Sequence, residues 1–271
     1  MKPLKVLGAL AASTLLLAGC GGSSTPDTTP TTDAPAGSNE TTDAAGGEEI
    51  TGTVTVLAAA SLTEAFTELA EQLKAEHPGI TVELSFGSST TLAQQIAEGA
   101  DADVYASAGR GAVDHLPDDF AANGDTADIA SNVLEIAVPK GNPGGVKGLN
   151  DFTRADIDTV LCAETVPCGK AADEAFSKAN LTPTPVSREI DVKATLSKVT
   201  LGEADAAIVY QSDVATAGDD VEGVDIPEDQ NVKMAYPMLW SNTDAATIAF
   251  VELVKGPDGL AALSKAGFGA P

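Results

Sequence analysis

Residues 53–73 of the chain read TVTVLAAASLTEAFTELAEQL, and this stretch decides the fold. Residues 53–57 form a short apolar run with β-branched side chains, which is typical of a buried strand. From residue 62 to residue 73, leucine and phenylalanine recur at helical spacing, so a helix follows the strand after only a few residues. A strand that leads directly into a helix is the repeating unit of α/β proteins.

The same alternation continues along the 271 residues. We expect further strands at residues 80–86, 103–107, 133–138, 159–163, 188–190, 206–210 and 233–240. Helices are expected at residues 90–98, 167–179, 192–199, 244–255 and 258–265. Short connections between alternating strands and helices predict an α/β architecture with largely parallel sheets, in two lobes with a cleft between them.

The N-terminal residues predict export. Two lysines precede an apolar run at residues 6–18, which is too short for a permanent membrane span and has the size of a signal-peptide core. The run ends in Leu-Ala-Gly before Cys20, which is the cleavage pattern of lipoproteins. We therefore expect a signal peptide at residues 1–19 and a lipid on Cys20. An ordinary signal peptide with an incidental cysteine is the alternative.

A polar segment follows Cys20. Residues 21–49 contain no aromatic residue and no Lys or Arg. Such a segment cannot bury enough apolar surface to offset its ordering entropy, so we expect a disordered tether at residues 20–49. The lipid and the tether together predict a folded domain held at the outer face of the cell membrane.

The formal net charge of the chain is −25. This charge argues against nucleic acid as a partner and against adhesion to anionic lipid, so the lipid anchor is the only membrane contact that we expect. The acidity favours solubility and does not indicate a cationic ligand, because local dipoles set the sign of the ligand. We expect a monomer.

Cys162 and Cys168 remain as a pair in an oxidising compartment. A disulfide between them would close a short loop and would make it rigid more than it would stabilise the fold. Two free thiols or a metal site are the alternatives. The two histidines, His77 and His115, have no Cys or His at a spacing that would complete a metal site, so we expect no metal ligands and no cofactor.

Polar groups gather where predicted strands end and helices begin. Ser61 and Glu64 fit a capping box, and Ser88 and Ser89 open the next helix. In the second unit, Pro167, Cys168 and Gly169 open one helix, and Asp191 is the expected cap of the helix that starts at Val192. Tyr210 ends a strand, where its hydroxyl can reach a cleft or pack in the core.

Each of these positions, taken singly, can be explained as a helix cap. Taken together, they predict an anion-binding site. Helix N-termini carry unpaired N–H donors and a partial positive charge. No Lys or Arg stands at these positions, and a dry site of neutral N–H and O–H donors selects a fully ionised oxyanion. Lys170 and Lys193 follow two of the anchor positions, and we expect both lysines to face solvent.

The motifs around these residues resemble those of the molybdate-binding proteins, which are the extracytoplasmic receptors of molybdate ABC importers. The resemblance covers residues 52–268. It rests on the stretches LAAASLTEA (57–65), FGSSTTLAQQI (86–96), GADADVYASA (99–108), VPCG (166–169) and GEADAAIVY (202–210), with Tyr236-Pro237 and Gly267-Phe268.

The resemblance implies a type 2 periplasmic binding protein, in which two α/β lobes are joined by two crossover strands. Lobe one would hold residues 50–134 and 236–271, and lobe two residues 135–235. The oxyanion would be bound by the hydroxyl and backbone N–H groups of Ser61 and Ser89, the backbone N–H groups of Cys168 and Val192, and the hydroxyl of Tyr210. Cys168 stands where the family usually has Ala, and a bridge to Cys162 would hold this loop.

The implied function is the capture of molybdate or tungstate, by lobe closure, for delivery to an ABC permease. A receptor for sulfate or phosphate, and a signalling or adhesion lipoprotein on the same fold, are the alternatives. We do not expect an enzyme, because the chain has no Gly-x-Ser-x-Gly motif and neither histidine lies in a catalytic motif.

Overall fold

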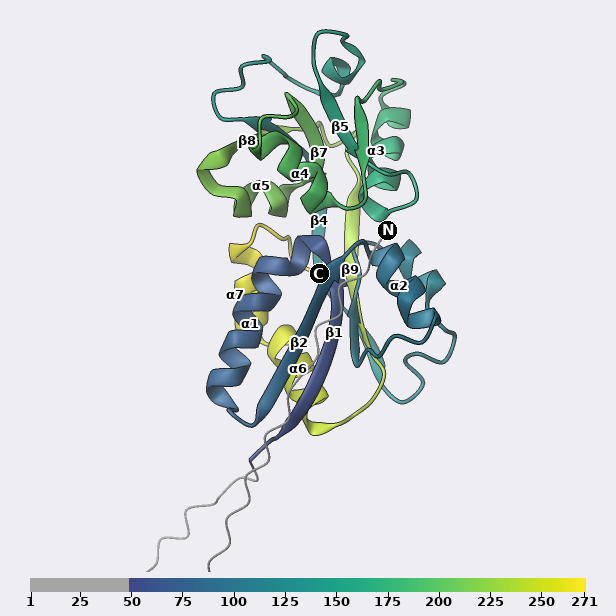
Figure 1. Ribbon diagram of the computed structural model, residues 1–271, viewed down its shortest axis with the longest axis vertical. Helices are drawn as coiled ribbons and strands as arrows, with labels where there is room; N and C mark the ends of the chain where they lie inside the picture. The colour runs from purple at the N-terminus through teal and green to yellow at the C-terminus, as the bar shows by residue number, and fades with distance from the viewer. Residues whose placement is uncertain (1–48) are drawn as a thin grey trace, which may run out of the picture. The chain divides into compact units, whose positions relative to one another are not determined.

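The computed structural model describes residues 49–271 (Figure 1). These residues belong to one compact unit. The predicted signal peptide, Cys20 and nearly all of the predicted tether lie outside them. Within the described part, no helix combines the length and the apolar character needed to cross a membrane.

The described residues contain nine strands and seven α-helices. The strands are β1 (Gly52–Ala59), β2 (Ile80–Gly87), β3 (Val104–Ala106), β4 (Asp125–Pro139), β5 (Thr159–Cys162), β6 (Ser187–Glu189), β7 (Ala206–Tyr210), β8 (Val221–Asp225) and β9 (Lys233–Trp240). The helices are α1 (Thr63–Glu76), α2 (Ser89–Ala97), α3 (Pro167–Lys178), α4 (Val192–Thr200), α5 (Gln211–Ala217), α6 (Ala245–Lys255) and α7 (Pro257–Lys265). Short 3₁₀ helices include η1 (Ala60–Leu62) and η2 (Arg110–His115).

The strands pair in the order β2-β1-β3-β9-β4-β7-β5-β6, and β8 also pairs with β4. In the first lobe β1 runs parallel to β2 and β3, and in the second β5 runs parallel to β6 and β7. The sheet is therefore parallel where each lobe consists of strand–helix units, as the sequence predicts. Strands β4 and β9 are antiparallel to their neighbours.

Strands β4 and β9 connect the two lobes (Figure 1). Residues 125–133 of β4 pair with β9, and from Leu134 onward β4 pairs with β7 and β8. One strand thus belongs to both lobes. The change of partner falls between Val133 and Leu134.

Each lobe has its own aromatic pair in the core. In lobe one, Phe66 of α1 and Phe250 of α6 pack edge to face, with ring centroids 5.6 Å apart. In lobe two, the rings of Phe152 and Phe176 lie 5.5 Å apart. All four side chains are fully buried. The helices are thereby held against their sheets, and the loops that follow the strands are left to line the space between the lobes.

Candidate ligand-binding site

A small cavity lies between the lobes, beyond the carboxyl ends of β1, β2, β5 and β7. Its volume is about 20 Å³. Pockets that bind organic ligands enclose roughly 300–1,000 Å³, so this one has room only for a small ion. Its lining contains all five residues expected to bind an oxyanion: Ser61, Ser89, Cys168, Val192 and Tyr210.

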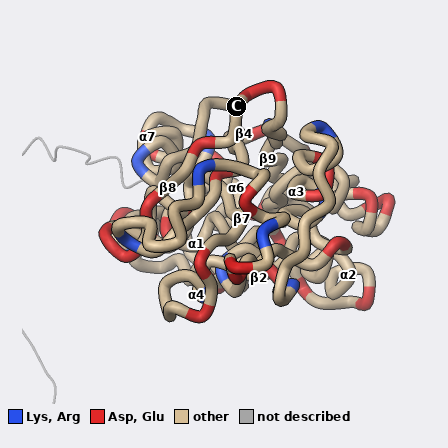
Figure 2. The backbone as a smooth tube through the Cα atoms, turned by 90° about the horizontal axis from the view of Figure 1, so that it is seen from above, with Lys and Arg blue, Asp and Glu red and all other residues tan. Residues whose placement is uncertain are grey.

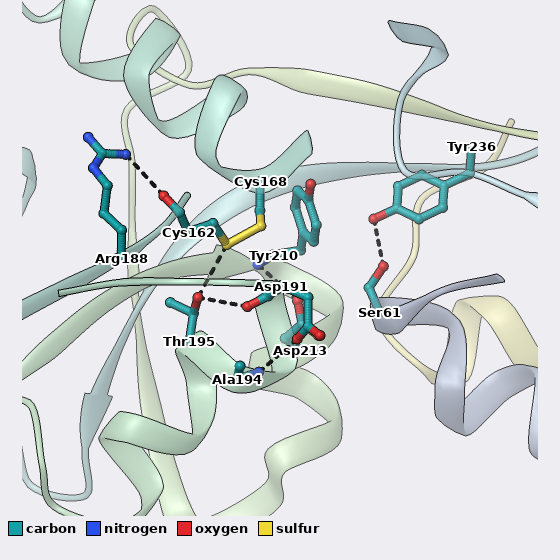
Figure 3. The surroundings of a disulfide bond; sticks show 10 residues. All are labelled: Ser61, Cys162, Cys168, Arg188, Asp191, Ala194, Thr195, Tyr210, Asp213 and Tyr236. Atoms are coloured by element: carbon teal, nitrogen blue, oxygen red, sulfur yellow. Dashed lines mark hydrogen bonds between the residues drawn. A yellow bond between two sulfur atoms is a disulfide. The ribbon is translucent and has the colours of Figure 1, made fainter. Parts of the chain in front are cut away.

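Ser61 does not cap α1, so the predicted capping box is wrong. A 3₁₀ turn (η1) precedes the helix, and α1 therefore begins at Thr63 without a side-chain cap. The Oγ of Ser61 instead lies 2.9 Å from the hydroxyl of Tyr236, and both groups are buried (Figure 3). This buried contact joins the turn that follows β1 to β9. The hydroxyl of Ser61 therefore contacts Tyr236 and does not cap α1.

Tyr236 also belongs to a wider hydrogen-bond network. The side-chain amide of Asn132 donates to the Oγ of Ser212 at 2.8 Å and to the hydroxyl of Tyr236 at 3.4 Å. Burial raises the pKa of Tyr236, so its phenol stays protonated at neutral pH. Since Tyr236 accepts from Asn132, it can donate its own proton to Ser61. The hydroxyl proton of Ser61 is then available to a ligand.

Ser88 and Ser89 lie at the N-terminus of α2. Ser88 occupies the cap position, but its hydroxyl makes no cap bond and has no hydrogen-bond partner among residues 49–271, although it is buried. The Oγ of Ser89 accepts a hydrogen bond from the backbone N–H of Ala108 at 3.0 Å. The hydroxyl of Tyr105 donates to the carbonyl of Ser89 at 2.8 Å. Ser89 is thus fixed on two sides, and its own hydroxyl proton remains free.

A disulfide between Cys162 and Cys168 fastens the first turn of α3 to the end of β5 (Figure 3). Gly169 is required beside it, because a Cβ at this position would lie 1.9 Å from the carbonyl oxygen of Ala163. The backbone N–H of Cys168 lies in the first turn of α3, where N–H groups have no partner within the helix. This donor is therefore held at the cavity by a covalent bond and by close backbone packing.

The start of α4 provides a second backbone N–H donor, that of Val192. Asp191 caps this helix as predicted, because its Oδ1 accepts a hydrogen bond from the N–H of Ala194 at 2.8 Å. The hydroxyl of Thr195 lies 3.2 Å from the Sγ of Cys162 and 2.8 Å from the carbonyl of Asp191. The disulfide and the α4 N-terminus thus form one packed group, and the N–H of Val192 at the first helical position lines the cavity.

Tyr210 stands at the end of β7 and is 1% exposed. Its hydroxyl has no hydrogen-bond partner among the described residues. Burial raises the pKa of Tyr210 well above its ordinary value, so the group is a neutral phenol that can donate one hydrogen bond. In Figure 3 its ring lies between the disulfide and the Ser61–Tyr236 pair. Tyr210 also lines the cavity.

Within the described part of the chain, no Lys or Arg lines this cavity. The expectation that Lys193 faces solvent is wrong, because its side chain is only 25% exposed. Its ammonium group lies 2.8 Å from Glu64 of α1 and 3.4 Å from buried Asp213 of α5. Burial raises the pKa of Asp213 to about 6 against the lowering effect of Lys193. The lysine thus bridges the two lobes.

The arrangement suits a small, fully ionised anion. The five expected residues present N–H and O–H donors from both lobes and no formal charge. Among residues 49–271, no group of three His, Cys, Asp or Glu side chains is placed to hold a metal ion. The Ser61–Tyr236–Asn132 network was not predicted, and no local pattern reveals it, because its members are far apart in the sequence.

Comparisons with known proteins agree with this architecture. The profile of the bacterial extracellular solute-binding protein family matches residues 54–269. The molybdate-binding protein ModA of Mycobacterium tuberculosis is 36% identical over 221 residues, which are 80% of this chain and 85% of that protein.

Solved structures of other proteins share the fold. A substrate-binding domain assigned to a molybdenum ABC transporter of Clostridium difficile is 27% identical with a TM-score of 0.58, over 81% of this chain and 99% of that one. The periplasmic molybdate-binding protein of Azotobacter vinelandii is 20% identical with a TM-score of 0.69, over 80% and 99% of the two chains. These relatives are solute-binding proteins and not enzymes. The chain therefore belongs to the bacterial extracellular solute-binding proteins, and it has the type 2 periplasmic binding fold of their molybdate-binding members.

Proposed function

We propose that this protein captures molybdate, and also tungstate, outside the cytoplasmic membrane and delivers it to the permease of an ABC importer. The observation that carries the proposal is the cavity of about 20 Å³ whose lining includes buried hydroxyls without a partner among residues 49–271, namely those of Tyr210 and Ser88. A buried hydroxyl without a partner costs about 1–3 kcal/mol, and a bound anion would remove this cost.

The relatives favour molybdate over other small anions. Among them are the Mycobacterium tuberculosis protein named for molybdate binding and the Clostridium difficile domain assigned to a molybdenum transporter. Molybdate at neutral pH carries no proton, so every ligand oxygen can accept from the donors of this site. Phosphate retains a proton at neutral pH, and this site offers no acceptor for that proton. Sulfate is smaller than molybdate, so donors spaced for molybdate would be too far apart to bind sulfate.

Lobe closure would account for capture, because the proposed donors come from both lobes. Ser61 and Ser89 would donate through their hydroxyls and backbone N–H groups from lobe one. Cys168 and Val192 would donate backbone N–H groups from lobe two, together with the hydroxyl of Tyr210. An anion that contacts both sides stabilises the closed state, because the open state lacks half of these contacts. The closed complex is the form that we expect the permease to recognise.

The predicted lipid on Cys20 would keep the receptor close to its permease. Since Cys20 lies outside the described residues, this part of the proposal rests on the cleavage pattern alone. A tether of about 30 residues reaches roughly 30 Å on average, enough for the folded domain to meet a membrane partner without leaving the surface.

Isothermal titration of the purified protein with molybdate, tungstate, sulfate and phosphate tests the proposed function. We expect tight binding of molybdate and tungstate and no heat with sulfate or phosphate. Binding of sulfate alone would instead identify a receptor for a smaller oxyanion. No heat with any of the four, from a protein with a cooperative thermal transition, would contradict the proposal.

A further inference from the structure

A second and larger cavity opens next to the first. Its volume is about 410 Å³, and it lies between α2 and η2 of lobe one and α3 of lobe two. Ala108 and Pro167 line both cavities, so the two are direct neighbours. This second cavity has about twenty times the volume of the inner cavity, and we call it the outer cavity.

The outer cavity is basic, in contrast to the rest of the molecule. Arg110, Lys170 and Lys233 line it, from η2, α3 and the start of β9. Asp and Glu positions are scattered around the whole outline of the molecule in Figure 2, and the chain carries a net charge of −25. Most of this surface repels an anion. A local group of cations would therefore attract the anion to one place on the surface.

Two of these cations are not neutralised by a neighbour. Of the Lys and Arg side chains in residues 49–271, only those of Lys74, Lys147, Lys170 and Lys233 form no ion pair with another described residue. Two of the four therefore lie in one cavity. The third cation, Arg110, pairs with Asp128, and Glu174, the one acidic residue of the lining, pairs with Lys178 at 3.0 Å.

A polar group inside the outer cavity is also unsatisfied. Thr90, at the second position of α2, lines the cavity and is 6% exposed. Its hydroxyl is buried and has no hydrogen-bond partner among the described residues. Thr90 follows Ser89, which lines the inner cavity. An unsatisfied donor of the outer cavity is thus the chain neighbour of a residue that lines the inner cavity.

An ion pair joins the lobes on the other side of the crossover strands. Lys193 of α4 bridges to Glu64 of α1 there, at 2.8 Å. In Figure 1, α1 faces α4 and α5 on one side of the crossover strands, whereas α2 faces α3 on the other. The outer cavity therefore lies on the side away from the bridge.

We propose that the outer cavity is an access site, where Lys170, Lys233 and Arg110 attract a tetrahedral dianion and pass it over Thr90 to the inner cavity. This inference rests on the proposed function, because it takes the same anion as ligand. The site acts on the rate of association. Its residues do not belong to the five that would hold the anion, so the rate of dissociation is set elsewhere.

Stopped-flow fluorescence of the purified protein with molybdate measures this effect. The double variant Lys170→Gln, Lys233→Gln should associate about tenfold more slowly at low ionic strength, with an unchanged dissociation rate. The difference should vanish at about 1 M salt, where charges are screened within roughly 3 Å. The matched control is Lys74→Gln, Lys147→Gln, which changes the net charge equally at lysines that also lack ion pairs.

The outcomes separate this inference from the proposed function. Equal association rates for wild type and the Lys170, Lys233 variant would overturn the access site while leaving molybdate binding intact. Equal slowing in the Lys74, Lys147 control would assign the effect to net charge, and this result would also overturn the access site. A wild-type protein that binds none of the four oxyanions would overturn the proposed function and the access site together.

Discussion

At the scale of single residues, the hydroxyl of Tyr210 is a donor that finds no acceptor among residues 49–271, in a fully buried side chain. We predict that Tyr210→Phe weakens molybdate binding by about 10- to 100-fold, because a hydrogen bond to a charged group contributes about 1.5–3 kcal/mol. The unfolding free energy without ligand should not fall, since the lost hydroxyl has no partner. Titration calorimetry and urea unfolding of the same variant measure the two quantities.

Thr159→Val is the control for Tyr210. The hydroxyl of Thr159 is also buried without a partner among residues 49–271, but it lies at the start of β5, and Thr159 lines neither cavity. Its removal should leave affinity unchanged. An affinity loss in Thr159→Val equal to that in Tyr210→Phe would mean that Tyr210 acts through packing and does not contact the anion.

Single residues also show where sequence reasoning stops. The sequence Ser61-Leu-Thr-Glu64 has the spacing of a capping box, but an added 3₁₀ turn moves the helix start to Thr63. Local patterns do not contain this information, because the turn is stabilised by contacts such as the bond from Ser61 to Tyr236, 175 residues away. The placement of Asp191 as a cap was predictable, because its bond to Ala194 is local.

At the scale of elements, the start of α3 depends on the disulfide between Cys162 and Cys168. We predict that the double variant Cys162→Ala, Cys168→Ala loses about 2 kcal/mol of unfolding free energy, since the closed loop is short. Affinity for molybdate should fall several-fold, through faster dissociation, because the N–H of Cys168 is less firmly held. Urea unfolding measures the loss of stability, and stopped-flow kinetics measure the dissociation rate. If the variant released molybdate at the wild-type rate, the disulfide would contribute to stability alone and not to binding.

The pairing of β4 with β8 predicts a pH dependence. Glu135 lies opposite Asp225, and burial, followed by the charge of Asp225, raises the pKa of Glu135 to about 7. The folded state thus binds this proton more tightly than the unfolded state. The contribution of Glu135 to stability therefore falls as the pH rises from about 4.5 to about 7, and the loss is complete above that range.

We therefore predict that Glu135→Gln is more stable than wild type at pH 8, by about 1 kcal/mol after allowance for solvent screening, and equally stable near pH 4. Urea unfolding across this range measures the difference, with Glu83→Gln on β2 as a control, since Glu83 is exposed. Parallel pH profiles for wild type and Glu135→Gln would contradict the assignment.

Strand β4 itself was only half predicted. Its second half, from residue 133, is apolar and was identified, whereas residues 125–132 contain Asp, Thr, Ser and Asn and read as a loop. Pairing with β9 makes this half a strand, with an irregularity between Asp128 and Ala130. Helix α5 and strand β8 were missed as well, because both are short and polar. Elements with a strong apolar pattern, such as β1, β7 and α1, were predicted closely.

At the scale of the whole molecule, the Glu64–Lys193 ion pair joins the two lobes. We predict that Glu64→Gln lowers molybdate affinity about two- to fivefold, because a partly exposed pair contributes about 0.2–1 kcal/mol. Glu68→Gln is a matched control, since Glu68 lies on the same helix and pairs with Lys265 of α7 within lobe one. Calorimetry should show a loss only for Glu64→Gln, and equal affinities would exclude a role of the bridge in closure.

The crossover strands also determine when each lobe can fold. The sheet of the first lobe takes β1, β2 and β3 from the beginning of the described chain and β9 from near its end. Gly269 pairs with Ser131, so a residue well beyond β9 is used there as well. The ribosome must therefore synthesise β9 and Gly269 before this lobe is complete, whereas β5, β6 and β7 are all made well before. Truncation by a few tens of residues at the C-terminus removes β9 and leaves a protein that can complete only one of its lobes.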